Sequence, residues 1–142
     1  MPAAVADIAR QFIQAWNADQ RHIVDDLAAP KFVAEYTHFP EPFEGPAAFK
    51  NMLAQTHQYF PDLSIEVQDV VADAPRAMVH WTYRGTFREG EMFGVEAAGQ
   101  SVEVTGMTKY EIRNGSVHSE RGVVDNFALM MQLGAEPTPA NR

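Results

Sequence analysis

Residues 102–134 read VEVTGMTKYEIRNGSVHSERGVVDNFALMMQLG and contain a strand, a turn, a second strand and a helix. From 102 to 112 apolar and polar side chains alternate, which is the period of a strand with one face on a core. The RNG triplet at 113–115 is typical of a hairpin turn. A second strand follows at 117–124, and an apolar helix begins after Asp125. The stretch predicts a β-hairpin that leads into the last helix.

The sequence before this hairpin predicts helices first and strands later. Apolar residues at three- and four-residue steps predict helices at 3–16, 21–28 and 46–60. Pro30 is expected to close the second of them. Alternating residues predict strands at 64–72 and 77–87 and a weaker one at 32–39. This order predicts an α+β fold, in which three N-terminal helices pack against a curved, mixed or antiparallel sheet and a short helix ends the chain.

The composition limits the classes of protein to which the chain can belong. Its 142 residues suit one domain, which we place at 1–134 with a flexible tail at 135–142. The formal net charge of −8 argues against nucleic acid and an anionic membrane surface as partners. The chain has no Cys, which excludes disulfides, thiolate nucleophiles and Cys-based metal sites. The first residues match neither a signal peptide nor a membrane span, so a cytoplasmic protein is expected.

Seven short motifs give the chain a family resemblance. They follow one another along nearly the whole sequence and read WNAD (16–19), GPAAFK (45–50), FPDL (60–63), VHWTYRGTF (79–87), GEMFGVEAAGQSV (90–102), TGMTKYEIRNG (105–115) and VVDNFALMMQLG (123–134). With these motifs the chain resembles the SnoaL-like polyketide cyclase family. The resemblance implies the cone-shaped, nuclear-transport-factor-like fold, in which helices and a bent sheet enclose a deep pocket. It implies no single reaction, because this fold serves many.

The resemblance also shows where the chain departs from the family. In SnoaL-like cyclases an Asp on the last strand acts as acid and base, three residues before a second Asp that opens the final helix. Matching the second Asp to Asp125 places the acid at Gly122, and the His that often accompanies it falls at Thr108. Gly122 is expected to enlarge the pocket, because it has no side chain. Asp125 is expected to cap the helix, which stabilises it by about 1 kcal/mol.

Glu120 and His118 are the titratable groups expected on the same strand face as this missing acid. Side chains two residues apart share one face of a strand, so both are expected to point into the pocket with position 122. Burial would raise the pKa of Glu120 toward the range of a useful acid or base. Alternatively, Glu120 only closes the mouth of the cone or pairs with His118.

A second polar cluster lies in EYTHFPEP, residues 35–42. More distant relatives, the limonene-epoxide hydrolases, have a Tyr and an Asn two residues apart before a Pro, where they hold the attacking water. The matching positions are Tyr36 and His38, and both could converge with Glu120 and His118. Backbone partners at a strand end are an equally good explanation for the two side chains. The limonene-epoxide hydrolases need an Arg and an Asp two residues apart on a middle strand. Epoxide hydrolysis is disfavoured, because no acid that could protonate an epoxide oxygen stands at the inward positions of the candidate strand, which are Val79, Trp81, Tyr83 and Gly85.

These observations predict a pocket enzyme that works without a cofactor or metal. The catalytic candidates are Tyr36, His38, His118 and Glu120. The residues expected to bind the substrate are Trp16, Phe49, Met52, Trp81, Tyr83, Phe93, Thr108, Tyr110 and Gly122. The expected substrate is a small hydrophobic carbonyl compound, such as a polyketide, that undergoes aldol-type ring closure, isomerisation or dehydration. The alternatives are a ligand-binding or accessory domain without catalysis and a purely structural dimer.

Two further expectations concern the outside of the molecule. The outer face of the sheet mixes polar and apolar groups, and relatives often dimerise there, so a homodimer is expected. His57 lies beside the apolar stripe of its helix and is expected at the surface. The five histidines show no metal-binding spacing.

Overall fold

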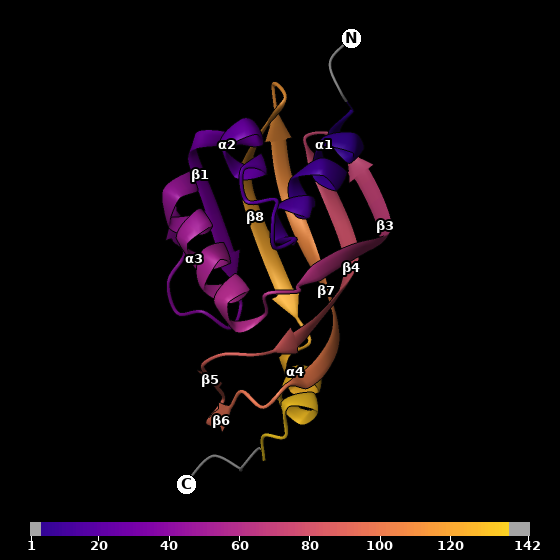
Figure 1. The fold of residues 1–142 in the computed structure, drawn as a ribbon. Coiled ribbons are helices and arrows are strands. Elements are labelled where there is room, and N and C mark those ends of the chain that lie inside the picture. Colours follow the sequence, from indigo (N-terminus) through magenta and orange to yellow (C-terminus); the bar gives the residue numbers. More distant parts are fainter. Residues whose placement is uncertain (1–3, 137–142) are drawn as a thin grey trace, which may run out of the picture.

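A bent sheet with three helices on one face forms the body of the protein. The computed structural model describes residues 4–136, so positions 137–142 of the predicted tail lie outside the described residues. Figure 1 shows α1 (Val5–Phe12), α2 (Ile23–Leu27) and α3 (Pro46–Tyr59) on the same side of the strands. A 3₁₀ turn, η1 (Ile13–Trp16), continues α1, and α4 (Asn126–Leu133) lies beyond the end of the sheet. Within 4–136 no helix is long and apolar enough to cross a membrane.

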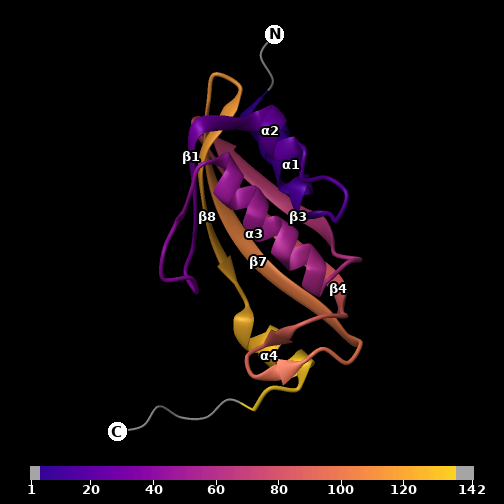
Figure 2. The same cartoon turned by 60° about the vertical axis from the view of Figure 1, so that its left-hand side comes forward.

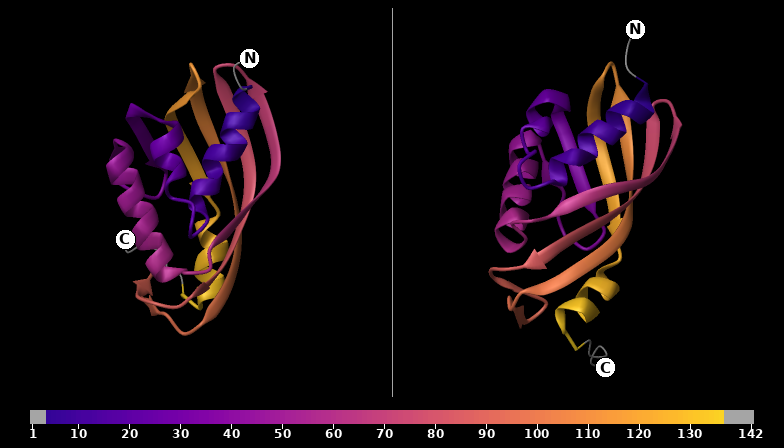
Figure 3. Two further views of the ribbon diagram at one scale, coloured as in Figure 1. Left: turned by 45° about the horizontal axis from the view of Figure 1, so that its top comes forward. Right: turned by 45° about the vertical axis from the view of Figure 1, so that its right-hand side comes forward.

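The described strands form one mixed sheet and a small separate hairpin. The main sheet has the order β2–β1–β8–β7–β4–β3. Its strands are β1 (Ala28–Tyr36), β2 (Phe43–Glu44), β3 (Ser64–Asp73), β4 (Arg76–Phe87), β7 (Gln100–Arg113) and β8 (Ser116–Val124), and the small hairpin is β5 (Glu91–Met92) with β6 (Val95–Glu96). β1 runs parallel to β8, and the other neighbours are antiparallel. Figures 2 and 3 show β4 and β7 bending along their length, so that the sheet curves around the helices. The predicted α+β fold is confirmed.

The β7–β8 hairpin forms where the sequence predicts it. Asn114 and Gly115 have φ angles of 52° and 79°, the left-handed conformations that a tight hairpin turn requires. After β8, Asp125 Oδ1 accepts a hydrogen bond from the backbone N–H of Ala128 at 3.0 Å. Gly134, with a φ of 92°, ends α4. The predicted helix cap at Asp125 is therefore confirmed.

The first strand departs from the prediction. β1 begins at Ala28, directly after α2, and Pro30 lies inside the strand instead of behind a helix. The pairing of β1 with β8 changes register between Ala28 and Val33. Proline has no N–H to donate to a neighbouring strand, so it is tolerated where the pairing is interrupted.

Two clusters of buried side chains stabilise the two ends of the fold. The first lies beneath α1 and α3, where the rings of Phe12, Phe32 and Phe49 pack with centroids 5.2 to 6.2 Å apart. The second joins the end of α3 to α4 and includes Phe60 and Leu129. The candidate site lies where these clusters meet, because its wall takes side chains from both.

Candidate functional site

A cavity of about 330 Å³ opens on the inner face of the sheet. Of the predicted site residues, those that line it are Trp16, Tyr36, His38, Met52, Trp81, Tyr83, Phe93 and Thr108. The wall also includes residues that the sequence did not single out for it, among them Phe39, Thr56, Phe60, Asn126 and Leu129. Among the described residues that form this wall there is no Asp, Glu, Lys or Arg. The cavity therefore suits an uncharged, largely apolar molecule.

Strand pairing orders the inward-facing side chains by depth. One row across the sheet, which we call the Glu120 row, contains Ala34, Glu120, Tyr110 and Ala77. The next row toward the exposed His38, the Tyr36 row, contains Tyr36, Gly122, Thr108 and Val79. The cavity touches the Tyr36 row and does not touch the Glu120 row. Glu120 thus lies one row behind the closed end of the cavity.

Gly122 does not enlarge the cavity, contrary to the prediction. Tyr36 is its cross-strand partner, and a Cβ atom added at Gly122 would overlap ring carbons Cδ1 and Cε1 of Tyr36. The aromatic ring lies over the bare glycine, an arrangement known from other sheets as aromatic rescue. The family's acid would therefore compete with the ring of Tyr36 for the same space.

Thr108, at the position of the family's His, is already engaged by a neighbour. Its Oγ1 accepts a hydrogen bond from the indole Nε1 of Trp81 at 2.9 Å, and its side chain is buried. Trp81 lies over Gly106, its own cross-strand partner, in a second aromatic–glycine pair. Two such pairs, on neighbouring rows of the sheet, shape one wall of the cavity.

Tyr36 and Glu120 form a buried hydrogen-bonded pair. The Tyr36 hydroxyl donates to Glu120 Oε2, while Glu120 Oε1 has no partner among the described residues. Only 2% of Glu120 is exposed, and this burial raises its pKa to about 8, although the bond from Tyr36 acts in the opposite direction. Burial, with the neighbouring Glu120 charge, raises the pKa of Tyr36 well above its ordinary value, so Tyr36 keeps its proton. At neutral pH both groups are mainly uncharged.

Tyr110 and Phe49 belong to the core and do not line the cavity, contrary to the prediction. Tyr110 is fully buried in the Glu120 row, and its hydroxyl has no partner among the described residues. Its ring packs on Phe12 with centroids 5.9 Å apart. Phe49 packs edge-to-face behind Trp16, whose indole takes the place at the cavity wall. Both residues are inward-facing, but they lie one layer too deep.

His118 does not join the cluster, contrary to the prediction. The pairing of β7 with β8 shifts between Glu111–Ser119 and Ile112–Val117, which leaves His118 as the extra residue of a β-bulge. A bulge reverses the alternation, so Val117 takes the buried position. His118 is half-buried and does not line the cavity.

His38 lies at the mouth of the cavity, beside Tyr36. The two ring centroids are 6.1 Å apart. Partial burial lowers the pKa of His38, so its imidazole is neutral near pH 7. Phe93, in the turn between β5 and β6, lies on the wall of the same cavity and is 44% exposed. Tyr36, His38 and Glu120 are therefore brought into one neighbourhood from β1, the loop after it and β8.

His57 is buried and not at the surface, contrary to the prediction. Only 7% of it is exposed, and it contacts the Trp16 carbonyl and Arg21. Sequence periodicity could not reveal this, because both partners lie more than thirty positions away, Trp16 at the end of η1 and Arg21 between η1 and α2.

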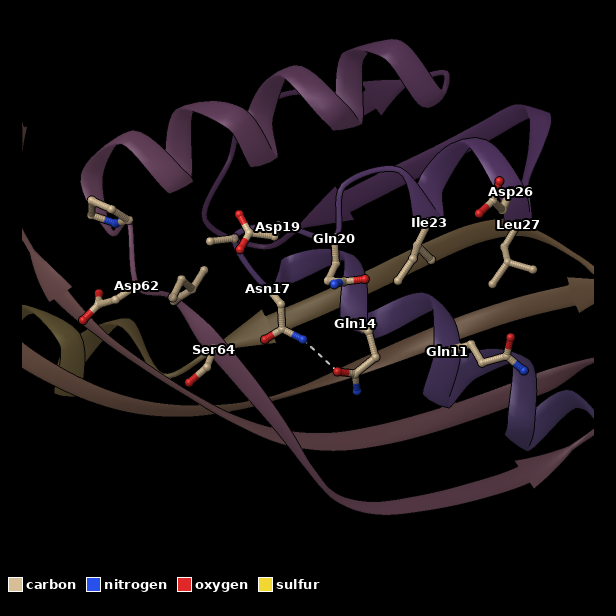
Figure 4. Close-up of a pocket in the computed structure, with 13 residues that line it drawn as sticks. Gln11, Gln14, Asn17, Asp19, Gln20, Ile23, Asp26, Leu27, Asp62 and Ser64 are labelled. Carbon is tan, nitrogen blue, oxygen red and sulfur yellow. Dashed lines mark hydrogen bonds between the residues drawn. The ribbon is translucent and has the colours of Figure 1, made fainter.

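A second, more open depression of about 700 Å³ lies outside the sheet–helix interface. Figure 4 shows its polar lining, in which Asn17 Nδ2 donates to Gln14 Oε1 at 2.7 Å. The carboxylates of Asp19, Asp26 and Asp62 lie apart around its rim. Within residues 4–136 no three His, Asp or Glu side chains converge in a way that could hold a metal ion.

Comparison with known proteins gives a family and a fold. The family profile described as SnoaL-like polyketide cyclase matches residues 6–133. A SnoaL-like polyketide cyclase candidate from Jannaschia sp. CCS1 is 24% identical, with 96% of this chain and 99% of that chain covered and a TM-score of 0.79. The polyketide cyclase candidate IdmH from Streptomyces antibioticus is 23% identical, with 94% and 100% covered and a TM-score of 0.80.

A third solved structure carries a different activity in its name. The hydroxylase candidate AclR from Streptomyces galilaeus is 23% identical, with 94% of this chain and 97% of that chain covered and a TM-score of 0.78. A search of curated proteins returns no match. At these identities the similar structures establish the fold.

Proposed function

Because the chain belongs to the SnoaL-like polyketide cyclase family, we propose that it is a cofactor-independent enzyme that moves protons on a small, neutral carbonyl compound. The observation that carries this proposal is the buried pair of Tyr36 and Glu120 behind the closed end of an apolar cavity. A carboxyl that stays protonated near pH 7 is a proton donor that water cannot reach.

The proton on Glu120 determines which way the hydrogen bond to Tyr36 runs. When Glu120 is ionised, the Tyr36 hydroxyl must donate to it, because a carboxylate can only accept. When Oε2 carries the proton, Glu120 donates to Tyr36 and the phenol proton is free for a ligand. Tyr36 lines the cavity and Glu120 does not, so Tyr36 is the group that touches the substrate.

His38 completes the proposed proton path. Its neutral imidazole takes a proton from the carbon beside the carbonyl, and the electron pair of that C–H bond forms the C=C bond of an enol. The carbonyl oxygen receives the Tyr36 proton, and Glu120 supplies its own proton to Tyr36. Return of a proton to a different carbon gives isomerisation. Attack of the enol carbon on a second carbonyl gives aldol-type ring closure, and loss of water then gives dehydration.

The cavity restricts the substrate to a small, neutral molecule. A volume of about 330 Å³ is at the low end of the range for ligand pockets, which suits one or two fused rings. A carboxylate or phosphate on the ligand would find no cationic partner in the described wall. The aromatic side chains of Trp16, Trp81 and Phe93 suit a flat apolar ring.

Solvent deuterium exchange tests the proposal without knowledge of the natural substrate. A cyclic ketone such as 1-tetralone is first shown to bind, and NMR then follows exchange of the protons beside its carbonyl. Wild-type protein is expected to accelerate exchange, and Tyr36→Phe and Glu120→Gln to lower the rate about a hundredfold or more. His118→Gln serves as the matched control and is expected to leave the rate unchanged. A bound ketone that exchanges no faster than in buffer would contradict the proposal.

The alternative function is binding of the same ligands without chemistry. It draws support from the ring of Tyr36 in the place of the family's acid and from Thr108 in the place of its His. In that case the ketone binds, no exchange is accelerated, and Glu120→Gln alters only stability.

We further propose a homodimer through the outer face of the sheet and a cytoplasmic location. Met107 and Val123 expose 52% and 54% of their surfaces there, and they lie beside His80, Lys109 and Arg121 on a shallow groove. Exposed methionine and valine on one sheet face favour a partner of similar character.

A further inference from the structure

The buried histidine of α3 has two partners that fix its protonation. His57 Nε2 lies 2.8 Å from the Trp16 carbonyl oxygen, and Nδ1 lies 2.7 Å from Arg21 Nη1. A carbonyl can only accept and a guanidinium can only donate, so Nε2 must carry the hydrogen and Nδ1 the lone pair. The imidazole therefore fits this position only as one neutral tautomer.

The residue that His57 holds is part of the cavity wall. Trp16 ends η1, and the backbone turns to an extended conformation at Asn17, so the Trp16 carbonyl points out of the helical turn. The Trp16 indole packs edge-on against Tyr36, with centroids 5.8 Å apart, and against Phe49 at 6.0 Å. Tyr36 in turn donates to Glu120. A contact that fixes the Trp16 backbone therefore also fixes the indole that packs against Tyr36, the hydrogen-bond partner of Glu120.

The residues that follow Trp16 lie between the inner cavity and the polar depression. Trp16 and Leu63 line the inner cavity, whereas Asn17, Ala18 and Leu63 line the polar depression of Figure 4. From β3, Asn17 Oδ1 accepts the backbone N–H of Ile65 at 2.9 Å. The backbone N–H of Ala18 donates to the Leu63 carbonyl at 3.3 Å, and His57 of α3 supplies a further attachment. Loss of the His57 attachment would loosen the wall between water and the cavity.

We infer that His57 is a positioning residue, whose neutral imidazole joins Trp16 to Arg21 and loses its hold on Arg21, and so on the segment after Trp16, when the imidazole gains a proton. A proton on Nδ1 would remove the acceptor of Arg21 and place two positive charges in contact. The charged groups that face His57 are Arg21, which opposes protonation, and Asp19, which favours it more weakly. Burial is the largest effect and lowers the pKa of His57 below its ordinary value of 6.5, although the hydrogen bond to the Trp16 carbonyl, which the imidazolium keeps, acts in the opposite direction.

The sign of the pH effect follows from this direction. The unfolded chain takes up the proton near pH 6.5, whereas the folded chain resists it until a lower pH. The stability that the neutral imidazole contributes is therefore complete above pH 6.5 and is lost as the pH falls from there through the lower, folded-state pKa, at which the contact with Arg21 breaks. The inference needs no ligand and no turnover, so it can fail or hold independently of the proposed function.

Tryptophan fluorescence can test this contact directly. The chain has two tryptophans, so Trp81→Phe leaves Trp16 as the sole indole. Acrylamide quenching of Trp16 is measured from about pH 8 to about pH 5, with far-UV circular dichroism to confirm that the fold persists. Quenching is expected to rise at least about twofold, with a midpoint below pH 6.5, where the imidazole of the folded chain gains its proton.

Three further variants in this background distinguish His57 from other titrating groups. His57→Gln, which can still donate to the Trp16 carbonyl but cannot titrate, is expected to remove the pH step. Arg21→Met is expected to move the midpoint upward, because the opposing charge is gone. His80→Gln, which alters a histidine bonded to Thr105 on the outer face at 2.9 Å, is expected to retain the step. A step that survives His57→Gln, or a midpoint unmoved by Arg21→Met, would overturn the inference.

Discussion

Replacing Gly122 with alanine tests whether the ring of Tyr36 occupies the place of the family's acid. The added Cβ would meet two ring carbons of Tyr36 and lie 3.4 Å from Thr108 Oγ1. Overpacking of this kind costs about 1–3 kcal/mol. A ring forced aside also breaks its bond to the buried Glu120 carboxyl, which costs about 1–3 kcal/mol more. Gly122→Ala is therefore expected to lower the free energy of unfolding by roughly 2–6 kcal/mol.

A double-mutant cycle distinguishes overlap with the Tyr36 ring from any other destabilising effect of alanine at position 122. Tyr36→Ala removes the ring, so Gly122→Ala in that background is expected to cost less than about 1 kcal/mol. The coupling between the two positions should reach about 2 kcal/mol, measured by urea unfolding followed by far-UV circular dichroism.

Gly106 and Trp81 supply the matched control for this cycle. An added Cβ at Gly106 would meet the Trp81 ring and also the backbone carbonyl of Val123. Because the backbone carbonyl cannot move aside, Trp81→Ala is expected to relieve only part of the cost of Gly106→Ala. Additive costs at Gly122 and Tyr36 would refute the placement of the ring over the glycine.

Three other predictions follow from the site and the outer face. Burial raises the pKa of Glu120 to about 8, so the folded chain keeps a proton that the unfolded chain releases near pH 4.5. The free energy of unfolding should therefore fall as the pH rises from 4.5 through 8. Relative to Glu120→Gln, the wild-type free energy of unfolding should drop by up to about 1.4 kcal/mol per pH unit in that range, and parallel curves would contradict the burial of an ionisable carboxyl. In calorimetric titrations 2-naphthol should bind at least about tenfold more tightly than 2-naphthoate, because the described cavity wall has no cation to pair with a carboxylate. Equal affinities would contradict binding in this cavity. Met107→Lys on the exposed outer face should convert a dimer to a monomer in sedimentation analysis, whereas a wild-type monomer would refute the dimer.

Local pattern was sufficient for much of the fold. Alternation over 102–112 and the Asn114–Gly115 turn predicted the β7–β8 hairpin, because both signals depend only on neighbouring residues. Asp125 could be recognised as a cap from its place before an apolar run. The parallel pairing of β1 with β8 could not be predicted in the same way, because the two strands are far apart in the chain.

The site was predictable only in part, and the reasons are geometric. Strand parity placed Glu120 on the inner face, but a single extra residue at His118 reversed parity on one side of it. Sequence gives no depth along a sheet, so it could not show that Glu120 lies one row behind the cavity. Nor could it show that the ring of Tyr36 covers Gly122, since that contact joins residues 36 and 122 across two strands.

The protonation of Glu120 is the most direct test of the proposed chemistry. Infrared difference spectra between wild-type protein and Glu120→Gln at pH 7 report whether the carboxyl carries a proton. We expect the C=O stretch of a protonated carboxylic acid in the wild type, absent from the variant and lost as the pH is raised beyond about 8. A carboxylate signal alone at pH 7 would mean that Glu120 holds no proton to give, and the proposed path through Tyr36 would be contradicted.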